Sequence, residues 1–216
     1  MQDFSIIITA GGTSSRYGKT NKLLEKINGK TVIEHTVSKF TGFVNVREII
    51  IPANVSIINE LKQIFSQPKI KIIEGGATRQ ESVYKGLQEV NCDYVLIHDG
   101  ARPLISSDII QKCFLETSEK NAISVMTKTT DTIKEVDGNG KIIRTIDRSK
   151  LYNTQTPQGF KTSVIKEVHE KLKTENFTDD CSMLEELGIP VYIVEGEYTN
   201  IKITTKSDLD FAKIYI

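Results

Sequence analysis

Short apolar runs rich in β-branched residues alternate with segments of helical periodicity, and this alternation constrains the fold more than any other feature. Four runs have the length and composition of strands: 5–9, 48–51, 70–73 and 94–97. The first, second and fourth are nearly unbroken, which is typical of parallel strands buried on both faces. Apolar residues recur at helical spacing in four further segments: 32–40, 57–65, 83–87 and 109–114. Strand and helix in alternation predict βαβ units, and hence an α/β fold whose open sheet carries helices on both faces.

Length, charge and cysteine usage exclude several classes of protein. The 216 residues include 28 Lys and Arg and 28 Asp and Glu, so no basic surplus favours binding to nucleic acid. The length fits a single domain over 1–216, at about 100–200 residues per domain. The apolar run 4–10 is too short to cross a membrane and lacks the charged segment of a signal peptide. Cys92, Cys113 and Cys181 show no CxxC spacing, which argues against a zinc site or a disulfide framework and predicts a cytoplasmic protein.

Residues 131–152 depart from the alternation of strands and helices. Two β-prone runs, 131–136 and 141–146, flank the cluster Asp-Gly-Asn-Gly at 137–140, and such a cluster between two runs predicts a hairpin. The hairpin can pack on its own domain. Because an isolated two-stranded ribbon is marginally stable in water, it can also be an arm that pairs with a second subunit.

The first predicted strand leads into the glycine-rich segment 10–12, which is followed by three cations, Arg16, Lys19 and Lys22. Small residues after a strand allow backbone N–H groups to approach an anion closely. The spacing matches neither GxxxxGK[ST] nor GxGxxG. Three cations within ten positions of Gly12 suit a triphosphate; the alternative interpretation is a glycine-rich turn with a solvated basic loop.

Asp99 lies where the fourth predicted strand ends, in the sequence His-Asp-Gly-Ala-Arg-Pro at 98–103. In open α/β sheets, ligands bind outside the carboxyl ends of the strands. A carboxylate at that edge can hold Mg²⁺ or ribose hydroxyls, or it can close the strand as an Asx-turn. The glycine-rich loop at the end of the first strand favours the metal or nucleotide role.

Two further clusters have both a functional and a purely structural interpretation. The segment 75–82 follows a strand and opens a helix, so its backbone can contact a base edge, or it can be an ordinary turn with Thr78 or Ser82 near the helix cap. The segment 176–185 predicts a helix start with Thr178 as N-cap and Asp179 and Asp180 in the first turn. Because these aspartates would repel a bound anion, capping is the favoured interpretation there.

Seven motifs occur together in one order along nearly the whole chain. They are Ala-Gly-Gly-x3-Arg-x5-Lys at 10–22, Gly-Gly-x2-Arg-x2-Ser at 75–82, His-Asp-Gly-Ala-Arg-Pro at 98–103, Asp-Thr-Ile-Lys at 131–134, Thr-Pro-Gln at 156–158, Thr-Asp-Asp at 178–180 and Asn-Ile-Lys-Ile-Thr at 200–204. With these motifs the chain resembles the 2-C-methyl-D-erythritol 4-phosphate cytidylyltransferases of the non-mevalonate isoprenoid pathway. The motifs at 98–103 and 200–204 are the most specific, whereas many nucleotidyltransferases share the glycine loop.

The resemblance implies a Rossmann-like α/β fold, an open and mostly parallel sheet with helices on both faces, that forms a homodimer through the protruding arm 131–152. It implies that CTP and methylerythritol phosphate react to give CDP-methylerythritol and pyrophosphate, with Mg²⁺ or another divalent cation and with no nucleic acid or membrane as partner. A ribitol-5-phosphate cytidylyltransferase is the alternative. A molybdenum-cofactor nucleotidyltransferase fits only the first loop.

The resemblance also implies roles for individual residues. Arg16 and Lys22 stabilise the transition state; Lys22 aligns better than Lys19 because the residues that follow it lead into the same downstream pattern. The nucleotide-binding residues implied are Ala10, Gly11, Gly12, Gly76, Ser82, Asp99 and Gly100, with Gly76 and Ser82 at the cytosine and Asp99 at the ribose and the metal.

For the second substrate, the resemblance implies that three residues hold the methylerythritol phosphate. These are Arg148, which reaches across from the partner's arm, together with Thr178 and Lys202. The family pattern thus reverses the preference for capping alone at Thr178.

Overall fold

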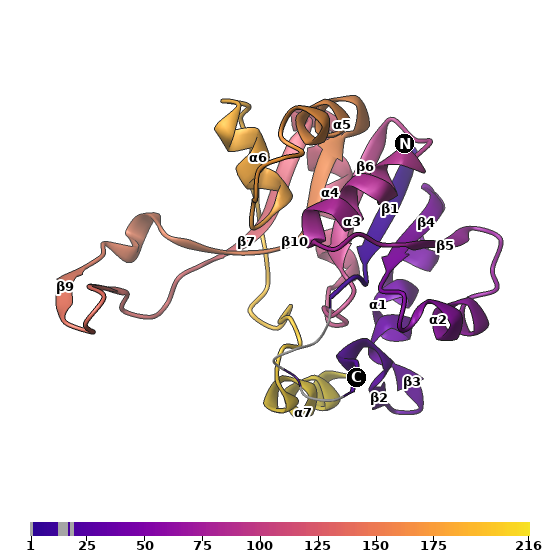
Figure 1. Cartoon of the computed structure of the whole chain (residues 1–216), viewed down its shortest axis with the longest axis horizontal. Helices are drawn as coiled ribbons and strands as arrows, with labels where there is room; N and C mark the ends of the chain where they lie inside the picture. Colours follow the sequence, from indigo (N-terminus) through magenta and orange to yellow (C-terminus); the bar gives the residue numbers. More distant parts are fainter. Residues whose placement is uncertain (1, 13–16, 18–19) are drawn as a thin grey trace.

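A seven-stranded sheet forms the centre of the structure, a computed structural model that describes residues 2–12, 17 and 20–216 (Figure 1). In spatial order its strands are β11 (Tyr192–Glu195), β7 (Ala122–Lys128), β10 (Tyr152–Lys161), β6 (Tyr94–Asp99), β1 (Phe4–Thr9), β4 (Val46–Ala53) and β5 (Ile70–Glu74). Strand β10 runs antiparallel to both of its neighbours, and the other adjacent strands pair in parallel. The open, mostly parallel sheet is therefore confirmed, although the sequence analysis assigned neither β7, β10 nor β11.

The described residues form seven α-helices, of which the last follows the final strand and the others lie between strands in the sequence. They are α1 (Val32–Thr41), α2 (Ile58–Ile64), α3 (Arg79–Gln88), α4 (Ser107–Lys120), α5 (Thr162–Lys171), α6 (Asp180–Glu186) and α7 (Lys206–Tyr215). The first four coincide with the segments of helical periodicity. Within the described part of the chain, no helix has the length and apolar character that crossing a membrane requires.

The two faces of the sheet are covered by different helices. Each face carries apolar side chains, because side chains alternate between the faces along a strand. Successive side chains of a strand point to opposite faces, so Ile6 and Ile8 of β1 lie in one core and Ile7 lies in the other. Helices α1, α2, α4 and α7 contribute buried residues to the first core, and α3, α5 and α6 to the second. Each fully buried aliphatic side chain stabilises the fold by about 1.5–3 kcal/mol.

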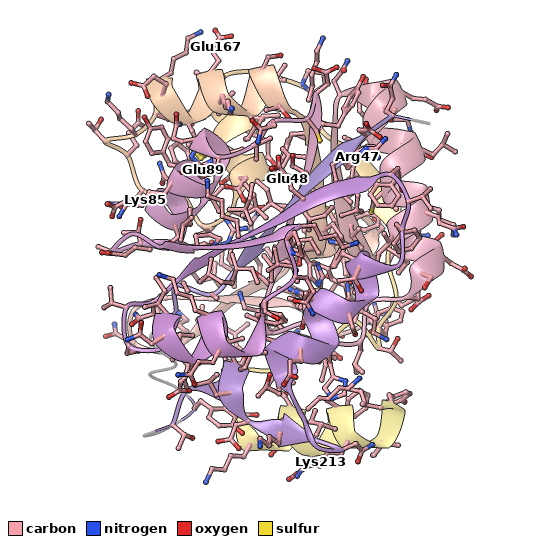
Figure 2. The ribbon with its side chains drawn as sticks, turned by 90° about the vertical axis from the view of Figure 1, so that its right-hand side faces the viewer. Arg47, Glu48, Lys85, Glu89, Glu167 and Lys213 are labelled. Atoms are coloured by element: carbon pink, nitrogen blue, oxygen red, sulfur yellow. The ribbon has the colours of Figure 1, made fainter. Side chains whose placement is uncertain are left out.

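Polar contacts fix the ends of the strands. At the amino end, the carboxylate of Glu48 on β4 accepts hydrogen bonds from Ser5 Oγ at 2.6 Å and from the backbone N–H of Asn91 at 2.7 Å. At the carboxyl end, Lys85 Nζ on α3 donates to the carbonyl of Gly75 at 2.8 Å and so holds the loop after β5 against the helix. Figure 2 labels both Glu48 and Lys85.

The start of α6 differs from the prediction that Thr178 is its N-cap. The N-cap is Asp179, whose Oδ1 accepts a hydrogen bond from the backbone N–H of Ser182 at 3.0 Å. Aspartate caps a helix as well as threonine does, and Asp179 is also held by Gln158 Nε2, which donates to its Oδ2 at 2.6 Å. Thr178 is thereby left outside the helix and exposed.

The predicted hairpin is present and extends away from the sheet at the left of Figure 1. Its strands β8 (Lys134–Val136) and β9 (Ile142–Thr145) are followed by a short 3₁₀ helix, η2 (Arg148–Lys150). Every residue of β8 and β9 is exposed. Near the start of the chain, another short 3₁₀ helix, η1 (Lys22–Leu24), leads into a smaller hairpin formed by β2 (Lys26–Ile27) and β3 (Lys30–Thr31).

Candidate active site

Two adjoining pockets lie where the carboxyl ends of β1 and β6 meet the start of α3. The first, of about 280 Å³, is lined by Thr9, Gly11, Gly12, Lys22, Leu23, Ala77, Thr78, Arg79, Ser82, Asp99, Gly100, Ala101 and Lys202. The second, of about 430 Å³, is lined by Arg79, Asp99, Arg102, Thr154, Gln155, Thr156, Gln158, Thr178, Asp179, Ser182, Glu185 and Lys202. Arg79, Asp99 and Lys202 line both, so these three residues form the wall that the pockets share.

The glycine loop packs tightly against the first turn of α3. A Cβ atom at Gly11 would lie 2.6 Å from Ser82 Oγ, and one at Gly76 would lie 2.4 Å from the side chain of Glu81. Ser82 Oγ accepts a hydrogen bond from the N–H of Gly76 at 3.0 Å and donates to the carbonyl of Thr78 at 2.8 Å. The structural interpretation of this segment is confirmed at Thr78, which is the N-cap of α3. Ser82 lines the first pocket, and its contact with a base stays a prediction.

The predicted nucleotide residues differ in what they present to the first pocket. Gly12 is exposed, and a Cβ atom there would meet no atom of the described residues within 4 Å apart from its chain neighbours. Ala10 lies in the core, where its N–H donates to the carbonyl of Pro52 and its carbonyl accepts from the N–H of Asn54, each at 3.0 Å. Gly11, Gly12 and Gly100 line the pocket, and Ala10 and Gly76 are not among its lining residues as the described part of the chain forms it.

Asp99 is surrounded by three cations. Lys202 Nζ lies 3.0 Å and Arg102 Nε 3.2 Å from its Oδ2, and Arg79 Nε lies 3.9 Å from its Oδ1. Burial by itself raises the pKa of this carboxyl, but the charges of Lys202, Arg79 and Arg102 outweigh burial and hold the pKa well below its usual range. Asp99 is therefore a carboxylate at neutral pH, at the centre of a positively charged wall.

Arg79 also forms an ion pair with Asp180, which joins the wall to the buried start of α6. Arg79 Nη1 lies 2.8 Å from Asp180 Oδ2, and the Asp180 side chain is only 1% exposed. Burial lowers the pKa of Arg79 and raises that of Asp180, but their mutual attraction is stronger, so the pKa of Arg79 is raised and that of Asp180 lowered. Both groups are charged, which buried groups tolerate only when they are paired.

A chain of hydrogen bonds fixes His98 in one tautomer. The N–H of Asp99 donates to Thr156 Oγ1 at 3.0 Å, so the hydroxyl can donate in turn to His98 Nδ1, also at 3.0 Å. The proton of the neutral ring then lies on Nε2, which donates to the carbonyl of Arg102 at 3.1 Å. His98 is fully buried, and burial lowers its pKa to about 4.

The two most specific motifs meet through Arg102 and Asn200. Arg102 Nη1 donates to the Asn200 carbonyl at 2.8 Å, and the Asn200 amide donates to the carbonyl of Thr156 at 3.0 Å. Arg79, Arg102 and Asp180 were not predicted from the sequence as site residues. Each lies inside one of the seven motifs, so its position beside a predicted residue was the available signal.

The remaining predicted residues lie at the edge of the two pockets, away from them, or outside the described residues. Thr178 lines the second pocket. Arg148 lies on the arm, where it donates to the carbonyl of Thr130, and it lines neither pocket as the described residues form them. Lys22 begins η1 and lines the first pocket. Arg16 and Lys19 lie outside the described residues.

This fold and this site define a nucleotide-binding α/β enzyme. The family model for IspD, 2-C-methyl-D-erythritol 4-phosphate cytidylyltransferase, matches residues 4–216, and the chain belongs to this family of nucleotidyltransferases. Curated relatives of that name include one from Dictyoglomus thermophilum, 42% identical over 94% of this chain and 92% of its own length. Another, from Prochlorococcus marinus, is 42% identical over 98% of each chain.

Solved structures agree over the full length. The 4-diphosphocytidyl-2C-methyl-D-erythritol synthase of Anaerococcus prevotii superposes with a TM-score of 0.87 at 32% identity, covering 99% of this chain and 98% of that one. The 2-C-methyl-D-erythritol 4-phosphate cytidylyltransferase of Francisella tularensis gives a TM-score of 0.86 at 30% identity, covering 99% and 100%.

Proposed function

We propose that this chain joins CTP and 2-C-methyl-D-erythritol 4-phosphate to give CDP-methylerythritol and pyrophosphate. The observation that carries the proposal is the pair of adjoining pockets that share the wall of Arg79, Asp99 and Lys202. A triphosphate in the first pocket and a sugar phosphate in the second meet at that wall. There an oxygen of the sugar phosphate can attack the α-phosphorus in line, and pyrophosphate leaves.

The main barrier that the site must lower is electrostatic, because two anions react. Two unit charges 4 Å apart repel by about 4 kcal/mol at an effective dielectric constant of about 20. Lys22 in the first pocket and Lys202 in the shared wall supply positive charge where the anions meet. The attacking phosphate is already ionised, so no general base is required. This agrees with His98, whose two ring nitrogens are both occupied by structural hydrogen bonds.

We further propose that Mg²⁺ accompanies the triphosphate. Within the described residues, no group of three His, Cys, Asp or Glu side chains could form a metal cage. Mg²⁺ is typically held by one or two carboxylates together with substrate phosphates and water. Asp99 supplies one such carboxylate, and Lys202 is 39% exposed, so it can turn away from Oδ2 to open that oxygen. When bound, the ion would neutralise phosphate charge.

Pyrophosphate release tests the proposed reaction. The protein is assayed with CTP and Mg²⁺ against methylerythritol phosphate and, separately, ribitol 5-phosphate. The relatives above bear the methylerythritol phosphate name, so we expect turnover with that substrate and little with ribitol 5-phosphate. A preference for ribitol 5-phosphate, or no CTP-dependent release of pyrophosphate with either sugar phosphate, would refute the proposal.

The cytoplasmic location stays a prediction.

The arm supports a proposed homodimer with shared sites. Val136, Ile142 and Ile143 are 53%, 58% and 57% exposed on a two-stranded ribbon that stands clear of its own sheet (Figure 1). Pairing with a second copy would bury this apolar surface. It would also bring Arg148 to the neighbour's second pocket, where a planar guanidinium can donate two hydrogen bonds to one phosphate.

Subunit mixing tests the shared site. Lys22→Ala and Arg148→Ala are each expected to be inactive as homodimers. In a mixed dimer, one site carries both lesions and the other carries neither, so activity should return, up to about a quarter of wild type if subunits exchange at random and the sites act independently. Mixed dimers that form without regaining activity, or a protein that is monomeric at assay concentration, would end the shared-site proposal.

A further inference from the structure

We propose that His169 is a positioning residue of this enzyme, which holds Arg79 in the shared wall by orienting Asp180. The inference rests on the proposed function, because it assigns Arg79 a role at the junction of the two substrate pockets. His169 itself lines neither of those pockets as the described residues form them.

The three side chains form a continuous chain of contacts from α5 to the pocket wall. His169 Nε2 on α5 lies 3.1 Å from Asp180 Oδ1 at the start of α6. Asp180 Oδ2 lies 2.8 Å from Nη1 of Arg79, the first residue of α3, and Arg79 Nε reaches to 3.9 Å from Asp99 Oδ1. The side chains of His169 and Asp180 are each 1% exposed, so water does not compete for these contacts.

The protonation of the chain follows from the acceptor character of Asp180. The Arg79 charge and the His169 hydrogen bond keep the pKa of this carboxyl below its ordinary value, although burial opposes them. An ionised carboxylate only accepts hydrogen bonds, so His169 carries a proton on Nε2 and donates it. The other ring nitrogen, Nδ1, is buried and makes no hydrogen bond within the described part of the chain. Among the described residues, the polar interaction that the imidazole makes is therefore its hydrogen bond to Asp180.

Arg79 depends on this support because its own contact with Asp180 is made to Oδ2, one of the two carboxylate oxygens. Arg79 Nη1 lies 2.8 Å from Oδ2, whereas His169 Nε2 lies 3.1 Å from Oδ1. The donated proton of His169 holds Oδ1, and the ring of Tyr84 stacks beside the imidazole, with the ring centroids 6.4 Å apart and an interplanar angle of 27°. The carboxylate then presents Oδ2 to Arg79 in one orientation.

A fixed guanidinium matters at this wall because it is pre-organised for two anions. An arginine side chain that is free to rotate loses conformational freedom each time a substrate binds. Held by Asp180, Arg79 keeps its charge directed at both pockets before either substrate arrives. Loss of His169 should therefore lower kcat/KM by way of Arg79, without removing any group that contacts a substrate.

The first test compares substitutions of His169 with the same change at another histidine. His169→Phe keeps a ring but removes the donor, and we expect kcat/KM for CTP to fall by about tenfold or more, as for loss of one hydrogen bond to a charged group. His169→Gln places an amide N–H near the position of Nε2 and should stay within about threefold of wild type. His35→Phe is the control: His35 on α1 contacts the carbonyl of Ile27 on β2 and lines neither substrate pocket as the described residues form them, so this variant should retain wild-type kcat/KM.

The second test is a double-mutant cycle with Arg79→Ala, measured both as kcat/KM and as CTP affinity by calorimetry. If His169 acts through Arg79, then His169→Phe should change neither quantity by more than about twofold in the Arg79→Ala protein. An equal fold-loss in both backgrounds would mean a general structural role and would overturn the proposal, as would failure of glutamine to rescue. Should His169→Phe not fold, His169→Asn, whose shorter amide cannot reach Asp180, takes its place. A wild-type protein that binds CTP but does not turn over methylerythritol phosphate refutes the proposed function instead, and the cycle in CTP affinity still decides the role of His169.

Discussion

Acidification from pH 7 to pH 5 should destabilise this protein through one buried histidine, His98. Burial lowers the pKa of His98 to about 4, and the neutral ring has both of its nitrogens satisfied, by the Thr156 hydroxyl and by the Arg102 carbonyl. A second ring proton would have to displace the proton that Thr156 donates. The unfolded chain meets no such obstacle and protonates near its ordinary pKa of 6.5.

The size of the effect follows from these two pKa values. Between pH 6.5 and about 4 the unfolded state binds one more proton than the folded state, so the free energy of unfolding rises with pH and falls on acidification, by about 1.4 kcal/mol per pH unit. From pH 7 to pH 5 the loss amounts to about 2 kcal/mol. For a chain of this size that corresponds to a decrease in Tm of about 4–8 °C.

Urea unfolding of the wild type and of His98→Asn at pH 7, 6 and 5, in EDTA to remove metal ions, measures this contribution. Asparagine does not titrate, so the variant is less stable at pH 7 but should lose about 2 kcal/mol less than the wild type between pH 7 and pH 5. Carboxylates titrate in both proteins and cancel in the difference. Equal losses in the two proteins, or a larger loss in the variant, would show that His98 is not held neutral by the fold.

Three further substitutions, the last with a matched glycine control, test the site and the core. Lys22→Ala should lower kcat by about 10²–10³ while CTP affinity stays within a few-fold, because the charge acts on the transition state; an unchanged kcat in steady-state assays would remove Lys22 from the mechanism. Arg148→Lys should raise the KM for methylerythritol phosphate far more than that for CTP, since an ammonium lacks the planar fork; equal effects on both substrates would contradict this role. Gly159→Ala places a Cβ 2.1 Å from Thr117 Oγ1 and should lower the unfolding free energy by about 1–3 kcal/mol. Gly138→Ala, whose Cβ would meet no atom of the described residues within 4 Å apart from its chain neighbours, should change the unfolding free energy by less than about 0.5 kcal/mol. Equal denaturant midpoints for the two glycine variants would argue against the packing at Gly159.

The sequence determined the features of this protein that depend on neighbours along the chain. The unbroken apolar run of β1 and the helical spacing within α1 follow from local periodicity, so both were predictable. The glycine loop and Asp99 were predictable for a related reason: each directly follows or ends a strand, and the carboxyl ends of parallel strands meet at one edge of a sheet. The arm was predictable from its turn residues.

Only the tertiary structure decided which distant residues meet. The antiparallel strand β10 is inserted between β6 and β7, and no local pattern specifies that choice of neighbours. Arg79 and Asp180 lie about a hundred positions apart in the sequence, yet they form an ion pair in which the Asp180 side chain is buried. Asp179 rather than Thr178 caps α6. The physical reason is that hydrogen bonds and ion pairs between distant segments depend on how the packed helices bring side chains within a few ångströms, whereas periodicity in the sequence specifies only which face of each element is buried.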